Sequence, residues 1–178
     1  MAGQRLTDKT ALEQQAGSGD LLMVVDVNDT TGSPEGTSKK MDFKYVIQTD
    51  KFSLTNAEVK LLSHGDSPKT LIGALSGYMI TPFNVTLLCT YAANTETSSN
   101  NLYFGYDSSL NTSVWHEIRD CMNSKTDDLT YMCVAKFPSG GTYNAPILNK
   151  PFVMWSNAGF NGGWSCDVYV TYAYTKVL

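Results

Sequence analysis

The sequence predicts a mostly β protein with two parts: a small N-terminal α/β-hairpin unit over residues 1–60 and an antiparallel β-sandwich of the jelly-roll type over residues 61–178. Three observations support this fold class. The chain holds ten Tyr and seven Phe but only 17% charged residues, and aromatic residues favour strands. Short apolar segments alternate with Gly/Asn/Ser/Pro clusters from residue 70 onward, as in sandwiches. No internal repeat has a fixed period, which argues against a propeller or solenoid.

The N-terminal unit is expected to contain two short helices on either side of a hairpin. Thr10–Glu13 and Thr55–Glu58 both have the form of a capping box. Between them, Leu21–Val27 is apolar and β-branched, and residues 40–47 alternate between apolar and polar side chains. A turn-rich loop over residues 28–38 joins these two strands.

A hairpin of two strands is marginal in water, so this one is predicted to need a partner. Its unpaired edges are templates for adding to another sheet. The residues expected to face that partner are Leu21, Leu22, Val24, Val25, Met41, Phe43 and Tyr45.

The second part is predicted to consist of short strands. The clearest is the last, in which Cys166, Val168 and Val170 alternate with more polar residues. Val114–Met122 fits a strand or a single helical turn equally well. The expected strands are Leu71–Leu75, Tyr78–Thr81, Val85–Ala92, Leu102–Tyr106, Thr130–Phe137, Phe152–Trp155 and Cys166–Val177.

Charge and hydropathy exclude several classes of partner. The net charge is −4 and the pI is near 5.0, and no basic cluster is larger than Lys39–Lys40, so nucleic acid is not expected. No segment approaches the roughly 18 apolar residues that a membrane span needs. The N-terminus has no apolar stretch of signal-peptide type, and we expect the chain to be made in a cytoplasm.

The sequence contains no recognisable metal, cofactor or catalytic motif. Cys89, Cys121, Cys133 and Cys166 are widely spaced without a C-x-x-C pair, which favours buried free thiols over disulfides or zinc. His64 and His116 are interpreted as ordinary side chains. A glycan hydrolase would need two carboxylates, and Asp107, Glu117 and Asp120 are the candidates, but such residues more often solvate loops. We therefore predict no enzyme and no cofactor.

Aromatic residues near loops leave two interpretations open. They can lie in the core or in a subunit interface, which is the favoured interpretation, or they can stack on sugar rings. Phe160 and Trp164 flank the turn-like Asn161–Gly163, and Tyr106 ends a predicted strand. The candidate glycan-binding tip therefore consists of Tyr106, Phe160 and Trp164.

The N-terminal pattern K-T-A-L-E-Q-Q … G-D-L-L-M-V-V-D-V-N-D-T-T-G … G-T-S-K-K-M-D-F-K-Y-V resembles the anchoring module of tailed-bacteriophage fibre and head-fibre proteins. The likeness covers residues 1–60, and the remainder resembles the jelly-roll heads of virion decoration proteins. The residues that carry the anchor pattern are Leu12, Asp20, Leu21, Val24, Val25, Asp26, Gly36, Thr37, Lys39, Lys40 and Phe43.

This resemblance implies a trimeric structural protein on the surface of a phage particle. Its partners would be two further copies of itself and the major capsid protein or other virion proteins. The chain has no collagen-like, coiled-coil or β-helical shaft, which favours a head fibre or capsid decoration protein over a long fibre. The alternative is a short tail fibre that binds host-surface glycans.

Overall fold

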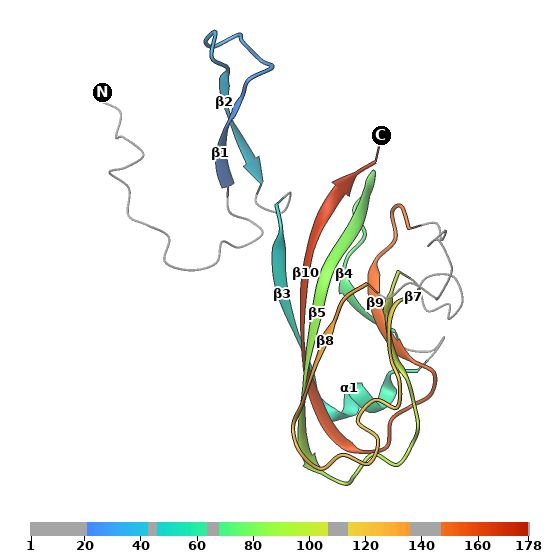
Figure 1. The fold of residues 1–178 in the computed structure, drawn as a ribbon. Helices are drawn as coiled ribbons and strands as arrows, with labels where there is room; N and C mark the ends of the chain where they lie inside the picture. The colour runs from blue at the N-terminus through green and yellow to red at the C-terminus, as the bar shows by residue number, and fades with distance from the viewer. Residues whose placement is uncertain (1–20, 43–45, 64–67, 107–113, 136–146, 178) are drawn as a thin grey trace, which may run out of the picture. The chain divides into compact units, whose positions relative to one another are not determined.

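The structure is a computed structural model that describes residues 21–42, 46–63, 68–106, 114–135 and 147–177 (Figure 1). It divides into two compact units, Met1–Val46 and Ile47–Leu178. The predicted boundary after residue 60 is therefore corrected to lie between Val46 and Ile47. The reason is that the segment after Ile47 pairs with the last strand of the chain and belongs to the sandwich. The predicted helix at Thr10–Glu13 lies outside the described residues.

The first unit contains the predicted hairpin. Strand β1 (Leu21–Asp26) pairs antiparallel with β2 (Thr37–Asp42), and Figure 1 shows the two strands side by side. The turn before β2 requires glycine at position 36, where φ is +121° and a Cβ atom would lie 2.8 Å from the Asp26 carbonyl oxygen. The predicted continuation of the second strand through Phe43 and Tyr45 lies outside the described residues.

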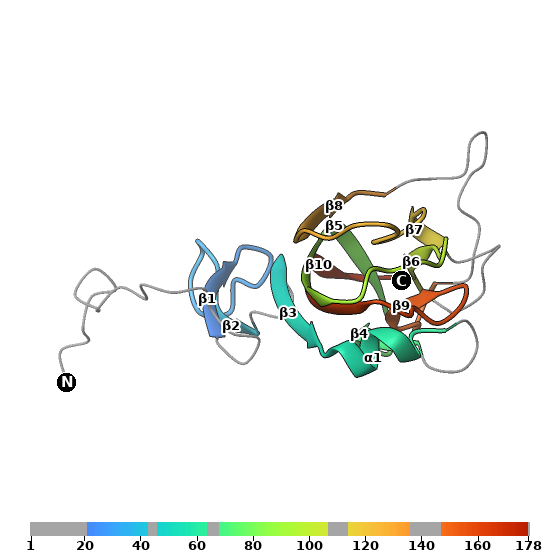
Figure 2. The ribbon, with the colours of Figure 1, turned by 90° about the horizontal axis from the view of Figure 1, so that it is seen from below.

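The second unit is a jelly roll. Sheet I has the strand order β3-β10-β5-β8 and sheet II the order β4-β9-β6-β7. In this unit the strands pair from the outside of the sequence inward: β3 with β10, β4 with β9, β5 with β8 and β6 with β7. All four pairs are antiparallel. Figure 2 shows the sheets as facing layers. The elements are β3 (Gln48–Leu54), α1 (Asn56–Leu61), β4 (Lys69–Ile72), β5 (Tyr78–Ala93), β6 (Leu102–Gly105), β7 (Val114–Ile118), β8 (Leu129–Cys133), β9 (Phe152–Ser156) and β10 (Gly163–Lys176).

The predicted jelly-roll fold is thus confirmed by the strand order, although its strands differ in part from those expected. Strand β3 was not predicted at all. Two predicted strands form the single long strand β5, because a bulge accommodates the proline between them: Thr171 pairs with Asn84 and Tyr172 with Pro82, so Phe83 has no pairing partner. The segment Val114–Ile118, for which a helical turn was an equal alternative, is strand β7.

Helix α1 begins at the predicted capping box. The Thr55 hydroxyl accepts a hydrogen bond from the Glu58 N–H, and the Glu58 carboxylate accepts one of 2.9 Å from the Thr55 N–H. Glu58 also contacts Lys69 of β4 at 2.9 Å, and that hydrogen bond, together with those from Thr55, lowers the Glu58 pKa to about 2. The helix contacts β3 and β10, so it belongs to the jelly roll and does not link two units.

The core lies between the two sheets and consists mainly of aromatic and β-branched side chains. Along β10, Cys166, Val168, Val170 and Tyr172 are buried while the residues between them are partly exposed, which confirms the predicted alternation. The largest fully buried side chains of this core include Trp164, Phe104 and Phe152.

Candidate functional site: the N-terminal hairpin

The hairpin has apolar side chains on both of its faces. Residues directly opposite each other in an antiparallel pair share a face. On one face, Leu22 lies opposite Met41. On the other, Met23 lies opposite Lys40 and Val25 lies opposite Ser38. A two-stranded sheet therefore leaves at least one apolar face without cover from its own strands.

The exposure of the side chains shows which face this is. Met23 and Val25, at alternate positions of β1, are 65% and 57% exposed, and Val27 in the turn after β1 is 68% exposed. Leu22, Val24 and Met41 are half-buried. Exposed methionine and valine side chains gathered on one strand are typical of a surface that binds a partner. Of the predicted partner-facing residues, Phe43 and Tyr45 lie outside the described residues, and the structure describes only the backbone of Leu21.

One end of the hairpin is fixed by charge. The Lys39 ammonium lies 3.0 Å from an Asp26 carboxylate oxygen and 2.8 Å from one of Asp29. The hydrogen bond from Lys39 lowers the pKa of both carboxyl groups, and those from Thr31 add to the effect at Asp29. Lys39 is therefore committed to the loop, whereas exposed Lys40 forms no ion pair within the described part of the hairpin.

These features suit strand addition. β1 and β2 pair only with each other in the described part of the chain, so the outer edge of each strand has free N–H and C=O groups. A shallow groove of about 340 Å³, lined by Leu22, Met23, Ser38, Lys39 and Lys40, runs across the pair. An added strand would gain backbone hydrogen bonds at the edge and apolar contacts from Met23 and Val25.

The predicted glycan-binding tip is wrong. Tyr106 is 5% exposed, Phe160 4% and Trp164 0%. The Tyr106 hydroxyl donates a hydrogen bond of 2.5 Å to the Ile80 carbonyl oxygen between the sheets. Trp164 packs against Tyr91, with ring centroids 5.0 Å apart. The turn-like Asn-Gly-Gly ends where β10 begins, so the aromatic residues beside it point into the core and cannot stack on a sugar.

Of the carboxylates considered for a glycan hydrolase, which was not the predicted function, Glu117 has side-chain partners. Glu117 accepts hydrogen bonds from Asn101 at 2.8 Å and from Arg119 at 3.1 Å. The Asp120 N–H donates to Asn101 from a left-handed turn position with φ of 48°. Asp107 and His64 lie outside the described residues, and His116 contacts the Val134 carbonyl oxygen. No group of three His, Cys, Asp or Glu side chains in the described residues is placed to hold a metal ion.

Glu96 is a buried carboxylate that the sequence did not single out. It is 0% exposed and accepts hydrogen bonds from the N–H groups of Asn161 at 2.8 Å and Gly162 at 2.7 Å. The Ser98 N–H and hydroxyl donate to its other oxygen. Burial alone would raise the Glu96 pKa, but these hydrogen bonds lower it. In the sequence, Glu96 lies in ANTETSSNN, which has the composition of an ordinary polar turn.

The four cysteines are buried and free, as predicted. Burial raises the pKa of the Cys121 and Cys133 thiols, to about 12 for Cys133. Cys89 and Cys166 lie in direct cross-strand register, with 3.4 Å between their sulfur atoms. The raised pKa leaves little thiolate at Cys121 and Cys133, which makes these two residues poor nucleophiles in the folded state.

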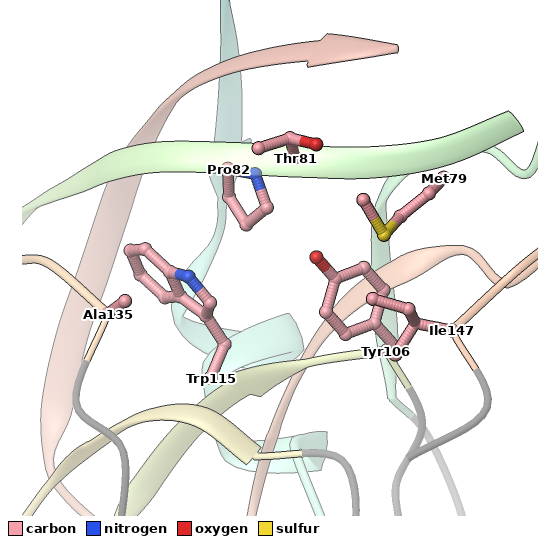
Figure 3. Close-up of a pocket in the computed structure, with 7 residues that line it drawn as sticks. All are labelled: Met79, Thr81, Pro82, Tyr106, Trp115, Ala135 and Ile147. Atoms are coloured by element: carbon pink, nitrogen blue, oxygen red, sulfur yellow. The ribbon is translucent and has the colours of Figure 1, made fainter. Parts of the chain in front are cut away.

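An apolar cavity of about 360 Å³ lies between the sheets (Figure 3). Figure 3 shows Tyr106 and Trp115 facing Pro82 of β5 across it. Two hydroxyl groups of its wall are paired, since the Thr81 hydroxyl contacts Thr175 at 2.7 Å and the Tyr106 hydroxyl donates to the Ile80 carbonyl oxygen of β5. Its wall consists of Met79, Thr81, Pro82, Tyr106, Trp115, Ala135 and Ile147.

Comparison with known proteins adds no functional assignment. No family model matches the sequence, and no curated protein matches it either. Among solved structures, the chain is similar to one in the cyanophage Pam1 capsid asymmetric unit, with a TM-score of 0.39, 12% identity and 97% of each chain covered. It is also similar to one in the crystal structure of Israel acute paralysis virus, with a TM-score of 0.27, 11% identity and coverage of 96% of this chain and 97% of the other. Similarity this weak does not support a fold or a function, so the fold assignment depends on the strand order.

None of the helices in the described ranges is long and apolar enough to cross a membrane.

Proposed function

We propose that this chain is a non-enzymatic structural protein of a tailed-bacteriophage particle, a head fibre or capsid decoration protein displayed on the virion surface. The hairpin unit attaches it to the major capsid protein or another virion protein, and the jelly roll is the displayed head. The observation that carries the proposal is the exposure of Met23, Val25 and Val27 on a unit of two strands separate from the jelly roll. The anchor-like sequence pattern of this unit supports the same interpretation.

The energetics of the hairpin are consistent with attachment. Burying a valine or methionine side chain that was fully exposed contributes about 1.5–3 kcal/mol. Met23, Val25 and Val27 are roughly two-thirds exposed, so covering all three would contribute about 3–6 kcal/mol before backbone pairing is counted. One such contact is weak, but three linked copies bind with a high effective concentration. A trimer would therefore attach more strongly than a single copy.

An exposed apolar patch on the jelly roll supports self-association. Cys133 of the edge strand β8 points into the core, so its neighbours Met132 and Val134 point outward, and they are 82% and 62% exposed. Phe83, the bulge residue of the adjacent strand β5, is 45% exposed. We infer that this β8 patch (Phe83, Met132 and Val134) is the contact between copies in a homotrimer.

The test separates attachment from folding. The double variant Met23→Ser/Val25→Ser should remain a folded trimer by light scattering and circular dichroism but should no longer bind particles that lack the protein. The matched control is Leu61→Ser, which removes an apolar side chain of similar exposure, 64%, from the jelly-roll unit. The control should bind normally. Normal binding by the double variant would refute the anchor assignment.

A deletion gives a second readout. A cut after residue 60 would remove β3 and α1 from the jelly roll, so the shortened chain must begin at Ile47. This chain should be a soluble trimer that does not attach. A soluble monomer would contradict self-association through the head while leaving the anchor assignment intact.

A further inference from the structure

Two thiols face each other in the centre of sheet I. Cys89 of β5 lies directly opposite Cys166 of β10, and their sulfur atoms are 3.4 Å apart. Cys89 is 1% exposed and Cys166 5%, so both point into the core. The other cysteine of this sheet, Cys133, lies opposite Val85 and has no thiol across from it.

The backbone geometry already fits a disulfide. Directly opposite residues of antiparallel strands have Cα atoms about 4.5–5.5 Å apart, within the roughly 4.4–6.8 Å that disulfides span. A sulfur–sulfur bond is about 2.05 Å long, so the two sulfur atoms must approach by about 1.4 Å. Side-chain rotation supplies most of such a movement, and the strands need not separate.

We propose that Cys89 and Cys166 form a reversible cross-strand disulfide when the protein meets a small oxidant outside a reducing cytoplasm. The pair is thus an oxidative modification site that joins the two central strands of sheet I. This inference does not depend on the proposed function, although a particle released from its host would meet such conditions.

Hydrogen peroxide illustrates the chemistry. The Cys166 thiolate, the more exposed of the two, attacks one peroxide oxygen, the O–O bond breaks, and hydroxide leaves and is protonated to water. The resulting sulfenic acid is attacked by the Cys89 thiolate, which forms the S–S bond and releases a second water. Overall, two thiols lose two hydrogen atoms and two electrons, and one peroxide is reduced to two waters.

The folded environment makes this reaction slow. The contact with Cys166 and burial both raise the pKa of the Cys89 thiol, so little thiolate is present near neutral pH. Oxidation is therefore expected over hours rather than seconds, at a rate limited by local opening of the sheet. Once formed, the bond closes a loop between positions 77 apart in sequence and constrains the unfolded chain.

The experiment uses the full-length protein, purified under reducing conditions and then incubated with a slight excess of hydrogen peroxide. Free thiols are blocked, the protein is digested without reductant, and the peptides are identified by mass spectrometry. The expected result is one cross-linked peptide pair, Cys89 with Cys166, that is reversed by dithiothreitol. The oxidised protein should also unfold at a temperature higher by roughly 5 °C or more.

Two variants sharpen the assignment. Cys133→Ser should still form the cross-link, whereas Cys89→Ser should leave Cys166 as a sulfenic acid that dimedone labels. The inference is overturned if the wild-type protein shows no linked peptide, links Cys121 to either residue, or is oxidised to sulfinic acid instead. The cross-linked peptides of the wild-type protein show whether Cys89 and Cys166 are joined, even where a variant fails to fold.

Discussion

The buried carboxylate of Glu96 gives the sharpest prediction about stability. Glu96 joins two loops that are distant in sequence, because one of its oxygens accepts the Ser98 N–H at 2.9 Å and the other accepts the N–H groups of Asn161 and Gly162. The substitution Glu96→Gln keeps the shape of the side chain but removes the charge and replaces one acceptor oxygen with an N–H₂ donor. We expect this single change to destabilise the jelly roll markedly.

The magnitude follows from the hydrogen bonds that a glutamine side chain cannot make. In the better of its two orientations, the oxygen of the introduced amide still accepts from Asn161 and Gly162, while its N–H₂ group faces the Ser98 N–H, which is left unsatisfied. A buried polar group without a partner costs about 1–3 kcal/mol. Loss of the charge weakens the two remaining bonds by about 0.5 kcal/mol each, since charge-assisted bonds are roughly twice as strong. The expected loss is about 3 kcal/mol, a large part of a typical domain stability.

The effect must also depend on pH in a definite direction. The hydrogen bonds of the folded state lower the Glu96 pKa from its ordinary value of 4.5. A lowered folded-state pKa means that the carboxylate stabilises the protein fully above the unfolded pKa and progressively less as the pH falls through the folded pKa. The difference between wild type and Glu96→Gln should therefore be constant at neutral pH and shrink below about pH 4.5.

Urea unfolding followed by tryptophan fluorescence measures both quantities. The matched control is Glu117→Gln, because Glu117 is only half-buried and its hydrogen bonds come from the side chains of Asn101 and Arg119. The control should change the free energy of unfolding by less than about 1 kcal/mol. A Glu96→Gln loss below about 0.5 kcal/mol at pH 7, or a loss that does not shrink in acid, would refute the reasoning.

Three further predictions concern packing and assembly. Gly163→Ala should lower the free energy of unfolding by more than about 3 kcal/mol in urea, or prevent soluble expression. The reason is that its Cβ would lie 1.6 Å from the Ala93 carbonyl oxygen. A stable Ala variant would contradict this close approach. Trp115→Ala should cost about 3–5 kcal/mol by enlarging the apolar cavity it lines, and a calorimetric loss below about 1 kcal/mol would show that the wall collapses to fill it. If the protein is the proposed trimer, Met132→Ser/Val134→Ser should convert it to a folded monomer in light scattering, whereas an unchanged trimer would place the contact elsewhere.

Local sequence signals predicted those parts of the fold that depend on local interactions. The capping box at Thr55–Glu58 needs contacts only within one helical turn, and the structure contains it. The alternation of apolar and more polar residues along β10 indicates a strand with one face in the core. Strand β3 was missed because its sequence, QTDKFSL, has few apolar residues. It is held instead by partners far along the chain, as in the contacts of Asp167 with Ser53 at 2.6 Å and Lys51 at 2.9 Å.

The prediction of a glycan-binding tip was wrong for a related reason. A turn-like sequence indicates that the chain reverses direction, but it does not show which neighbouring side chain is the first to enter the core. Here the reversal ends at Gly163, whose close approach to Ala93 starts the pairing of β10 with β5 and turns Trp164 inward. That placement depends on the tertiary contact, which no local pattern records.

The polar loops at this end of the jelly roll hold one another instead of a ligand. Asn100 donates to the Gly159 carbonyl oxygen at 2.8 Å, and Asn157 accepts from the Asn101 N–H at 2.7 Å. With Glu96, these contacts join the loop after β5 to the loop before β10. Groups committed to each other in this way are not free to recognise a partner. Large exposed apolar side chains occur instead on the hairpin and on the β8 patch, among other places in the described residues. These two surfaces are consistent with the assembly role proposed above.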